Sequence, residues 1–148
     1  NKWAIGMAHD RATSETEIWR KADTFGMEGE EVDGMDVLAV RGAAERAIER
    51  ARAGEGPTLL ECLTYRFRGH SLADPDELRS EEEKDFWAKR DPLKALEEDL
   101  TSKKLASADE LRAIEKEIDN EVNEAVEFAL NAPEPDPSEL TRYIWAED

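Results

Sequence analysis

Residues 30–67 read EEVDGMDVLAVRGAAERAIERARAGEGPTLLECLTYRF, and they change from a strand pattern to a helix pattern and back. Residues 30–32 predict a short strand before the Asp33-Gly34 turn, and residues 58–67 predict a second strand. Asp36 is typical of a helix start. The helix that follows has one apolar face, made of Val37, Val40, Ala44, Ala47, Ile48 and Ala51, and it ends at Gly54, Gly56 and Pro57. This order predicts a parallel, right-handed crossover unit, with space for a ligand at the carboxyl ends of its strands.

Helices are predicted before and after this unit in the sequence. A short amphipathic helix is expected over residues 14–25, closed by Gly26. Residues 68–79 have no apolar period and predict a loop. Four helices should follow, over residues 80–87, 91–100, 107–129 and 138–145, the second of which should bury Leu93, Leu96 and Leu100. We therefore expect an α/β fold with two regions, an α/β region at 1–79 and a helical region at 80–148.

The composition excludes several classes of function. The 148 residues contain 37 acidic and 20 basic side chains, which give a net charge of −17. An excess of this size argues against nucleic-acid and anionic-membrane partners, because both need basic surface. Neither a membrane-spanning segment nor a signal peptide is predicted. The single cysteine, Cys62, is typical of a reducing compartment, and its position in a strand predicts a buried, inert thiol.

Acidic side chains are concentrated in the second region. Residues 80–148 contain 21 acidic and 9 basic side chains, against 16 and 11 in residues 1–79. Solvated helix faces explain this asymmetry most simply. The alternative is an acidic docking surface, in which case the chain is a helical binding module for a basic partner and has no catalytic role.

Reactive side chains cluster after the second strand. Arg66, Arg68, His70 and Ser71 follow one another within six residues, around Gly69. Arginine binds phosphate or carboxylate oxygens with a planar fork, and histidine adds a donor that titrates near neutrality. This cluster predicts an anion site. The alternative is a structural loop in which Arg66 and Arg68 pair with carboxylates and His70 caps the loop or forms local hydrogen bonds.

Longer stretches carry a specific resemblance to a known family. They read NKWAIGMAHDRATS at 1–14, VDGMDVLAV at 32–40, GEGPTLLE at 54–61 and TYRFRGHSLADPDELR at 64–79. Together they resemble the alpha subunits of thiamine-diphosphate-dependent 2-oxo acid dehydrogenases, and among these the pyruvate dehydrogenases of the bacterial and plastid type. The resemblance implies that residues 1–79 belong to the three-layer domain that binds thiamine diphosphate, with 67–79 as its active-site loop.

The resemblance also implies roles for individual residues. Asn1 matches the last asparagine of the family's Mg²⁺ and thiamine diphosphate motif, and Trp3 stands where a backbone carbonyl completes the metal site. His70 matches a catalytic loop histidine that reaches the cofactor diphosphate, and Arg66 anchors that loop or faces the phosphate. Ser71 matches a serine that kinases phosphorylate in mitochondrial members. The second phosphorylated serine of that loop has no counterpart here, which argues against the same control.

The implied enzyme is larger than this chain. The resemblance implies an oxidoreductase connected with glycolysis. This enzyme decarboxylates pyruvate and transfers the acetyl group to lipoyl groups. The implied partners are a beta subunit, in an alpha-beta heterotetramer, and the lipoyl transacylase component of a multienzyme complex. Branched-chain 2-oxo acids and acetoin remain alternative substrates, and the compartment implied is bacterial cytoplasm or plastid stroma. Because the Gly-Asp-Gly part of the cofactor motif is not among the 148 residues, we interpret them as part of a longer polypeptide and expect them to be inactive alone.

Overall fold

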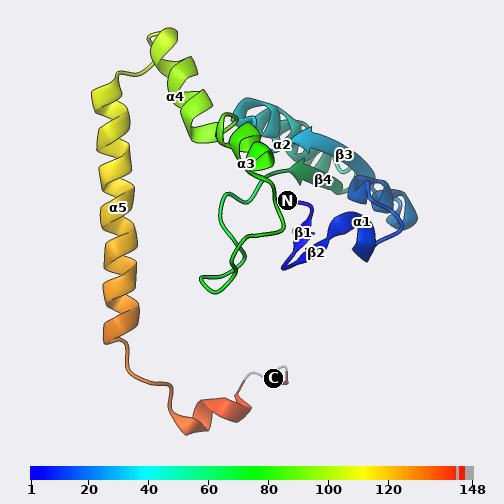
Figure 1. Ribbon diagram of the computed structural model, residues 1–148. Helices are drawn as coiled ribbons and strands as arrows, with labels where there is room; N and C mark the ends of the chain where they lie inside the picture. The colour runs from blue at the N-terminus through cyan, green and yellow to red at the C-terminus, as the bar shows by residue number, and fades with distance from the viewer. Residues whose placement is uncertain (143, 146–148) are drawn as a thin grey trace. The chain divides into compact units, whose positions relative to one another are not determined.

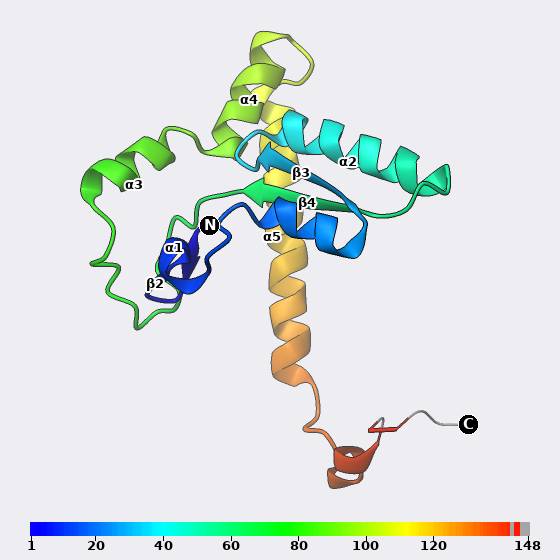
Figure 2. The same cartoon turned by 90° about the vertical axis from the view of Figure 1, so that its right-hand side faces the viewer.

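The strand, helix and strand predicted from residues 30–67 form one parallel unit. The computed structural model describes residues 1–142, 144 and 145. In it, β3 (Glu28–Asp33) pairs in parallel with β4 (Thr58–Leu63) over all six residues of each strand. Helix α2 (Val37–Arg52) connects the two strands and lies beside them (Figures 1 and 2). The parallel crossover is therefore confirmed, although β4 ends four residues earlier than predicted.

Helix α2 begins where its sequence predicts. Asp36 is the N-cap, and its Oδ1 accepts hydrogen bonds from the backbone N–H groups of Leu38 at 2.9 Å and Ala39 at 3.0 Å. A cap of this kind contributes about 1 kcal/mol to helix stability.

Helical segments cover opposite faces of the two strands. Glu30 forms an ion pair with Arg46 of α2, so its side chain lies on the α2 face of β3. Gly29 lies on the other face, because side chains alternate along a strand. A Cβ atom at Gly29 would lie 2.3 Å from the backbone oxygen of Trp19, which belongs to the 3-10 helix η1 (Ile18–Phe25). Only glycine lets η1 approach this closely.

The amino-terminal part differs from its prediction. β1 (Trp3–Ala4) and β2 (Met7–Ala8) form a short antiparallel hairpin, and α1 (His9–Ala12) follows. The helix predicted over 14–25 is the shorter 3-10 helix η1, which ends at Gly26 as predicted. Its first turn is fixed from a distance, because the Glu61 carboxylate of β4 accepts the N–H of Trp19 at 2.9 Å.

The remaining helices agree closely with their predicted starts. They are α3 (Glu81–Ala88), α4 (Pro92–Ser102), α5 (Ala108–Asn131) and the 3-10 helix η2 (Pro137–Thr141). Ser107 and Glu110 form the complete capping box predicted for α5. η2 covers the first part of the predicted helix 138–145, and residue 143 of that prediction lies outside the described residues.

The chain divides into two compact units, Asn1–Ser102 and Lys103–Asp148. The buried apolar side chains of the described residues all belong to the first unit, and they are Ala22, Val32, Met35, Ala43 and Tyr65. In the same unit the predicted burial of the α4 face is wrong for Leu93, which is 76% exposed. The spacing of apolar residues in α4 identifies an apolar face, but it does not show whether another element covers that face. The division of the chain into functional domains at residue 79 stays a prediction.

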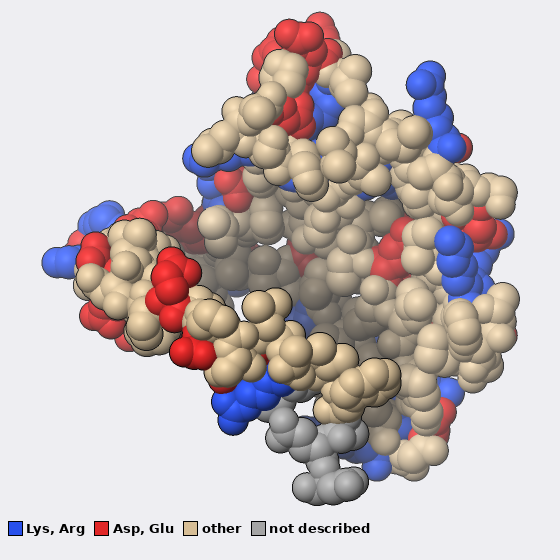
Figure 3. All heavy atoms as spheres, turned by 90° about the horizontal axis from the view of Figure 1, so that it is seen from below, with Lys and Arg blue, Asp and Glu red and all other residues tan. Residues whose placement is uncertain are grey.

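Charged side chains of both signs lie on the surface, as the composition predicts. The face shown in Figure 3 carries acidic and basic side chains among a larger uncharged surface. None of the helices within residues 1–142, 144 and 145 has the length and apolar character needed to cross a membrane.

Candidate active site

The loop that follows β4 is attached to the fold by an aromatic stack. Tyr65 is 9% exposed, and its ring stacks on Trp87 of α3 with a centroid distance of 5.2 Å and an interplanar angle of 9°. Burial is the main cause that raises the pKa of Tyr65, and the nearby Arg79 guanidinium opposes it. The beginning of the loop is therefore held in an apolar setting.

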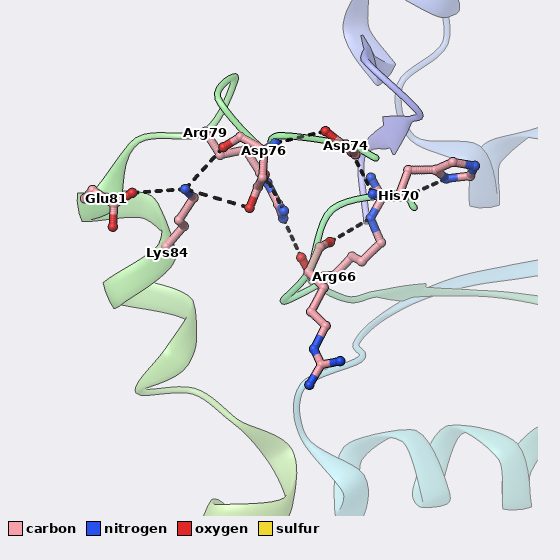
Figure 4. Close-up of polar contacts among 8 residues, drawn as sticks. Arg66, His70, Asp74, Asp76, Arg79, Glu81 and Lys84 are labelled. Atoms are coloured by element: carbon pink, nitrogen blue, oxygen red, sulfur yellow. Dashed lines mark hydrogen bonds and ion pairs between the residues drawn. The ribbon is translucent and has the colours of Figure 1, made fainter. Parts of the chain in front are cut away.

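Arg79 closes the other end of this loop. It is 7% exposed, and its guanidinium lies 5.0 Å above the Tyr65 ring. Its Nη1 donates to the backbone oxygen of Arg66, and its Nε donates to Asp76 Oδ1 at 2.6 Å. Lys84 of α3 donates to the backbone oxygen of Asp76 at 3.2 Å (Figure 4). These contacts join the two ends of the loop, and we call Tyr65, Asp76, Arg79 and Lys84 the loop clamp.

Asp74 organises the middle of the loop. Its Oδ2 accepts the backbone N–H of His70 at 2.7 Å, and its Oδ1 accepts the backbone N–H of Asp76 at 3.0 Å (Figure 4). These two backbone hydrogen bonds, that of His70 first, lower the pKa of Asp74 below its usual range. The carboxylate thus fixes the backbone position of His70.

Two of the residues predicted for the site lie in contact. Arg66 Nη1 is 3.3 Å from Nδ1 of the His70 ring, and Arg66 Nε donates to the backbone oxygen of Arg68 at 3.2 Å. The alternative prediction is wrong for Arg66, whose hydrogen bonds go to a ring nitrogen and a backbone carbonyl rather than to a carboxylate. Its other part is confirmed, because His70 forms local hydrogen bonds with Arg66 and Asp74. Both Arg66 and His70 remain accessible, since Arg66 is half-buried and His70 is exposed.

The other predicted site residues are held by separate contacts. Trp3 lines a small pocket of about 20 Å³ together with Arg66 and Asp74. Asn1 accepts the backbone N–H of Trp3 on its side-chain oxygen at 3.0 Å. Ser71 is exposed, and its backbone oxygen accepts the N–H of Asp74 at 3.1 Å. The structure thus brings Trp3 to the loop and keeps Asn1 beside Trp3.

The donor groups present fit an anionic ligand. A guanidinium and an imidazole side by side can both donate to phosphate oxygens, as the diphosphate of the expected cofactor requires. Asn1 and Trp3 offer two neutral oxygens, which Mg²⁺ accepts as ligands, whereas its octahedral shell needs six. Among the residues that the structure describes, no group of three or more His, Cys, Asp or Glu is arranged to hold a metal. The chemistry of Arg66 and His70 thus suits a phosphate ligand, and Asn1 and Trp3 would supply two of the six oxygen ligands that Mg²⁺ needs.

Two outcomes differ from the sequence analysis. Cys62 is exposed, so the prediction of a buried thiol is wrong. Within the part of the chain that the structure describes, β4 pairs with β3 alone, and its residues are only partly covered. Asp74 and Arg79 received no role from the sequence, although both orient site residues. The spacing of Asp76 and Arg79, three residues apart, is the one local signal for the clamp, but it is equally typical of solvent-exposed pairs.

Comparison with known proteins places the chain in one family. A family model described as the dehydrogenase E1 component matches residues 1–138. The chain is 58% identical, over all 148 residues, to a protein of Porphyra purpurea named pyruvate dehydrogenase E1 component subunit alpha. It is 60% identical over 147 residues (99% of the chain) to the chloroplastic subunit alpha-3 of the same component from Arabidopsis thaliana. It is 44% identical over 141 residues (95% of the chain) to the alpha subunit from Rhizobium meliloti. The chain spans 43%, 34% and 40% of the lengths of these three relatives.

Proposed function

Because the chain belongs to the dehydrogenase E1 component family, we propose that it is part of the alpha subunit of a pyruvate dehydrogenase that transfers acetyl groups. The observation that carries this proposal is the 58% identity to a pyruvate dehydrogenase alpha subunit over every residue of the chain. The adjacent Arg66 and His70 add a chemical reason, since they form the donor pair that a diphosphate needs. The full three-layer fold around this site is part of the proposal.

Thiamine diphosphate, when bound, supplies the electron sink that lets a 2-oxo acid lose carbon dioxide. The proposed task of this chain is to hold and orient that cofactor. His70 donates to a diphosphate oxygen, and Arg66 places positive charge beside it. Asn1 and Trp3 contribute oxygens to Mg²⁺. The loop clamp and Asp74 keep the two donors in position, so that little reorganisation is needed when an anion binds.

The proposed assembly has three components. We propose a beta subunit that completes the cofactor site in an alpha-beta heterotetramer, a lipoyl transacylase component as the acetyl acceptor, and pyruvate as the substrate. The proposed compartment is bacterial cytoplasm, with plastid stroma as the alternative, because the relatives include both bacterial and chloroplastic proteins. Ser71 is exposed and chemically open to phosphorylation, but no regulatory role is proposed for it.

The test compares three substrates in the alpha-beta enzyme that carries this chain. Pyruvate, a branched-chain 2-oxo acid and acetoin are each supplied with a lipoyl acceptor domain, and acyl transfer is measured. We expect the highest kcat/KM with pyruvate. A preference for either of the other two substrates would overturn the substrate assignment. Failure to bind thiamine diphosphate or to decarboxylate any of them would favour the acidic binding module.

A matched pair of variants tests the role of the loop. His70→Asn removes the donor ring, and we expect the Kd for thiamine diphosphate to rise about 10- to 100-fold, since a hydrogen bond to a charged group contributes about 1.5–3 kcal/mol. His9→Asn is the control, because His9 belongs to α1 and lies outside the loop. Equal effects of the two substitutions on cofactor affinity would refute the role of His70.

A further inference from the structure

The contact between Arg66 and His70 determines where the ring proton lies. Arg66 Nη1 is 3.3 Å from His70 Nδ1. A guanidinium has five N–H donors and no acceptor, so a hydrogen bond between the two requires Nδ1 to accept. A neutral imidazole with an accepting Nδ1 carries its single proton on Nε2. The geometry therefore selects one of the two tautomers of His70.

The guanidinium is held in the orientation that this selection needs. Arg66 Nε donates to the backbone oxygen of Arg68 at 3.2 Å, and the Arg66 backbone oxygen accepts from the buried Arg79. On the other side, Asp74 Oδ2 accepts the His70 backbone N–H at 2.7 Å. Both residues of the contact are thus fixed by bonds to other parts of the loop (Figure 4).

We propose that Arg66 is a positioning residue that keeps His70 in the Nε2–H tautomer, so that the exposed ring presents one N–H donor to an oxygen anion. The anion class is phosphate or carboxylate, and its identification as the cofactor diphosphate rests on the proposed function. This role is separate from any phosphate contact by Arg66, because its guanidinium keeps N–H donors besides those that bond to the ring and to the Arg68 carbonyl. A hydrogen bond fixed in advance costs less reorganisation when the ligand binds.

The tautomer is measured directly by NMR. The protein is labelled with ¹⁵N-histidine and studied without cofactor at about pH 8.5, two units above the ordinary imidazole pKa of about 6.5. The His70 signals are identified as those that disappear in His70→Gln. We expect Nδ1 at the shift of an unprotonated nitrogen and Nε2 at the shift of a protonated one. A proton on Nδ1 in the unmodified protein would overturn the proposal, whatever the variants show.

Two variants separate this role from a general effect on the loop. Arg66→Met keeps the length of the side chain and removes the donor, so both ring nitrogens should move toward the intermediate shifts of a tautomer mixture. Arg68→Met is the control, because within the described residues the Arg68 guanidinium has no hydrogen-bond or ion-pair partner, and its backbone oxygen is retained. We expect the control to keep the shifts of the unmodified protein. Unchanged shifts in Arg66→Met, or equal changes in both variants, would contradict the proposal.

Titration with inorganic phosphate links the tautomer to anion binding. Phosphate should move the Nε2 signal more than the Nδ1 signal, and Arg66→Met should weaken the apparent affinity about 2- to 10-fold, the range for loss of one net hydrogen bond. A larger response at Nδ1 would contradict the proposed donor. None of these readings depends on decarboxylation, so an inactive enzyme with an intact Nε2–H ring would refute the proposed function and leave this inference standing.

Discussion

Replacing Arg79 by methionine should release the loop that carries Arg66 and His70 without unfolding the sheet. The substitution removes the hydrogen bond to Asp76 and the one to the Arg66 backbone oxygen. It keeps an unbranched side chain of similar length above Tyr65. Both hydrogen bonds that are lost connect Arg79 to other loop residues and not to β3, β4 or α2. The effect should therefore be confined to the loop.

The magnitude follows from the contacts that are lost. Hydrogen bonds to charged groups contribute about 1.5–3 kcal/mol, and removing one partner of a buried ion pair costs about 3–5 kcal/mol. The free-energy cost of Arg79→Met should lie at the low end of these ranges, because Asp76 is partly exposed and keeps its ion pair with Lys84 at 3.7 Å. Sulfur against the Tyr65 ring replaces part of the cation–π contact. We expect about 2–3 kcal/mol, which is about a 30- to 140-fold shift toward the open loop.

Amide hydrogen exchange measures this opening. The backbone N–H groups of His70 and Asp76 donate hydrogen bonds to Asp74, so opening of the loop exposes them. Their exchange should accelerate by about 30- to 140-fold, whereas exchange of the α2 amides should change little. Arg68→Met serves as the control and should leave all these rates unchanged. An acceleration below about threefold at His70 and Asp76, or the same acceleration throughout α2, would refute the reasoning.

Three further substitutions test the fold and its pH dependence. Gly34→Ala would place a Cβ atom 2.7 Å from the backbone oxygen of Leu63, so it should lower the urea midpoint by the equivalent of about 1–3 kcal/mol, whereas Gly42→Ala meets only ordinary contacts and should raise it; equal effects would contradict the close approach. Ser107→Ala removes the cap of α5 and should cost about 1 kcal/mol, seen as lost helicity by circular dichroism; unchanged helicity would show that the cap does not matter. The depressed pKa of Asp74 means that its carboxylate stabilises the loop above the ordinary value of 3.8, and this contribution is lost as the pH falls through the lower folded value. Asp74→Asn should therefore remove the acid-dependent rise in loop exchange, and an unaltered pH profile would refute the assignment.

Features encoded within a few residues could be predicted from the sequence. The Asp36 cap and the Ser107 capping box depend on neighbours two or three residues apart, and both are present in the structure. The apolar face predicted for α2 is wrong for Val37 and Ile48, which are 40% and 47% exposed, and the buried residue of this helix is Ala43, which the prediction did not include. The parallel pairing of β3 and β4 was also predictable, because a helix of this length between two strands leads to a crossover.

Features that depend on distant residues could not be predicted in the same way. η1 begins at Ile18 rather than near residue 14, because Glu61, more than forty residues away, accepts the N–H of Trp19. Arg79 is similar, since a charged residue is normally assigned to the surface. Its burial follows from the Tyr65 ring beneath it, which no local pattern reveals.

The loop clamp changes how the two predicted regions relate to the site. The predicted boundary at residue 79 separates the loop from α3, yet Trp87 and Lys84 of α3 hold both ends of that loop. A change in α3 is therefore expected to reach His70 through Tyr65 and Asp76, without any contact between α3 and a ligand. This coupling is physical rather than statistical, because it passes through a stacked ring pair and a hydrogen-bonded backbone carbonyl. The start of the helical region thus belongs to the support of the candidate active site.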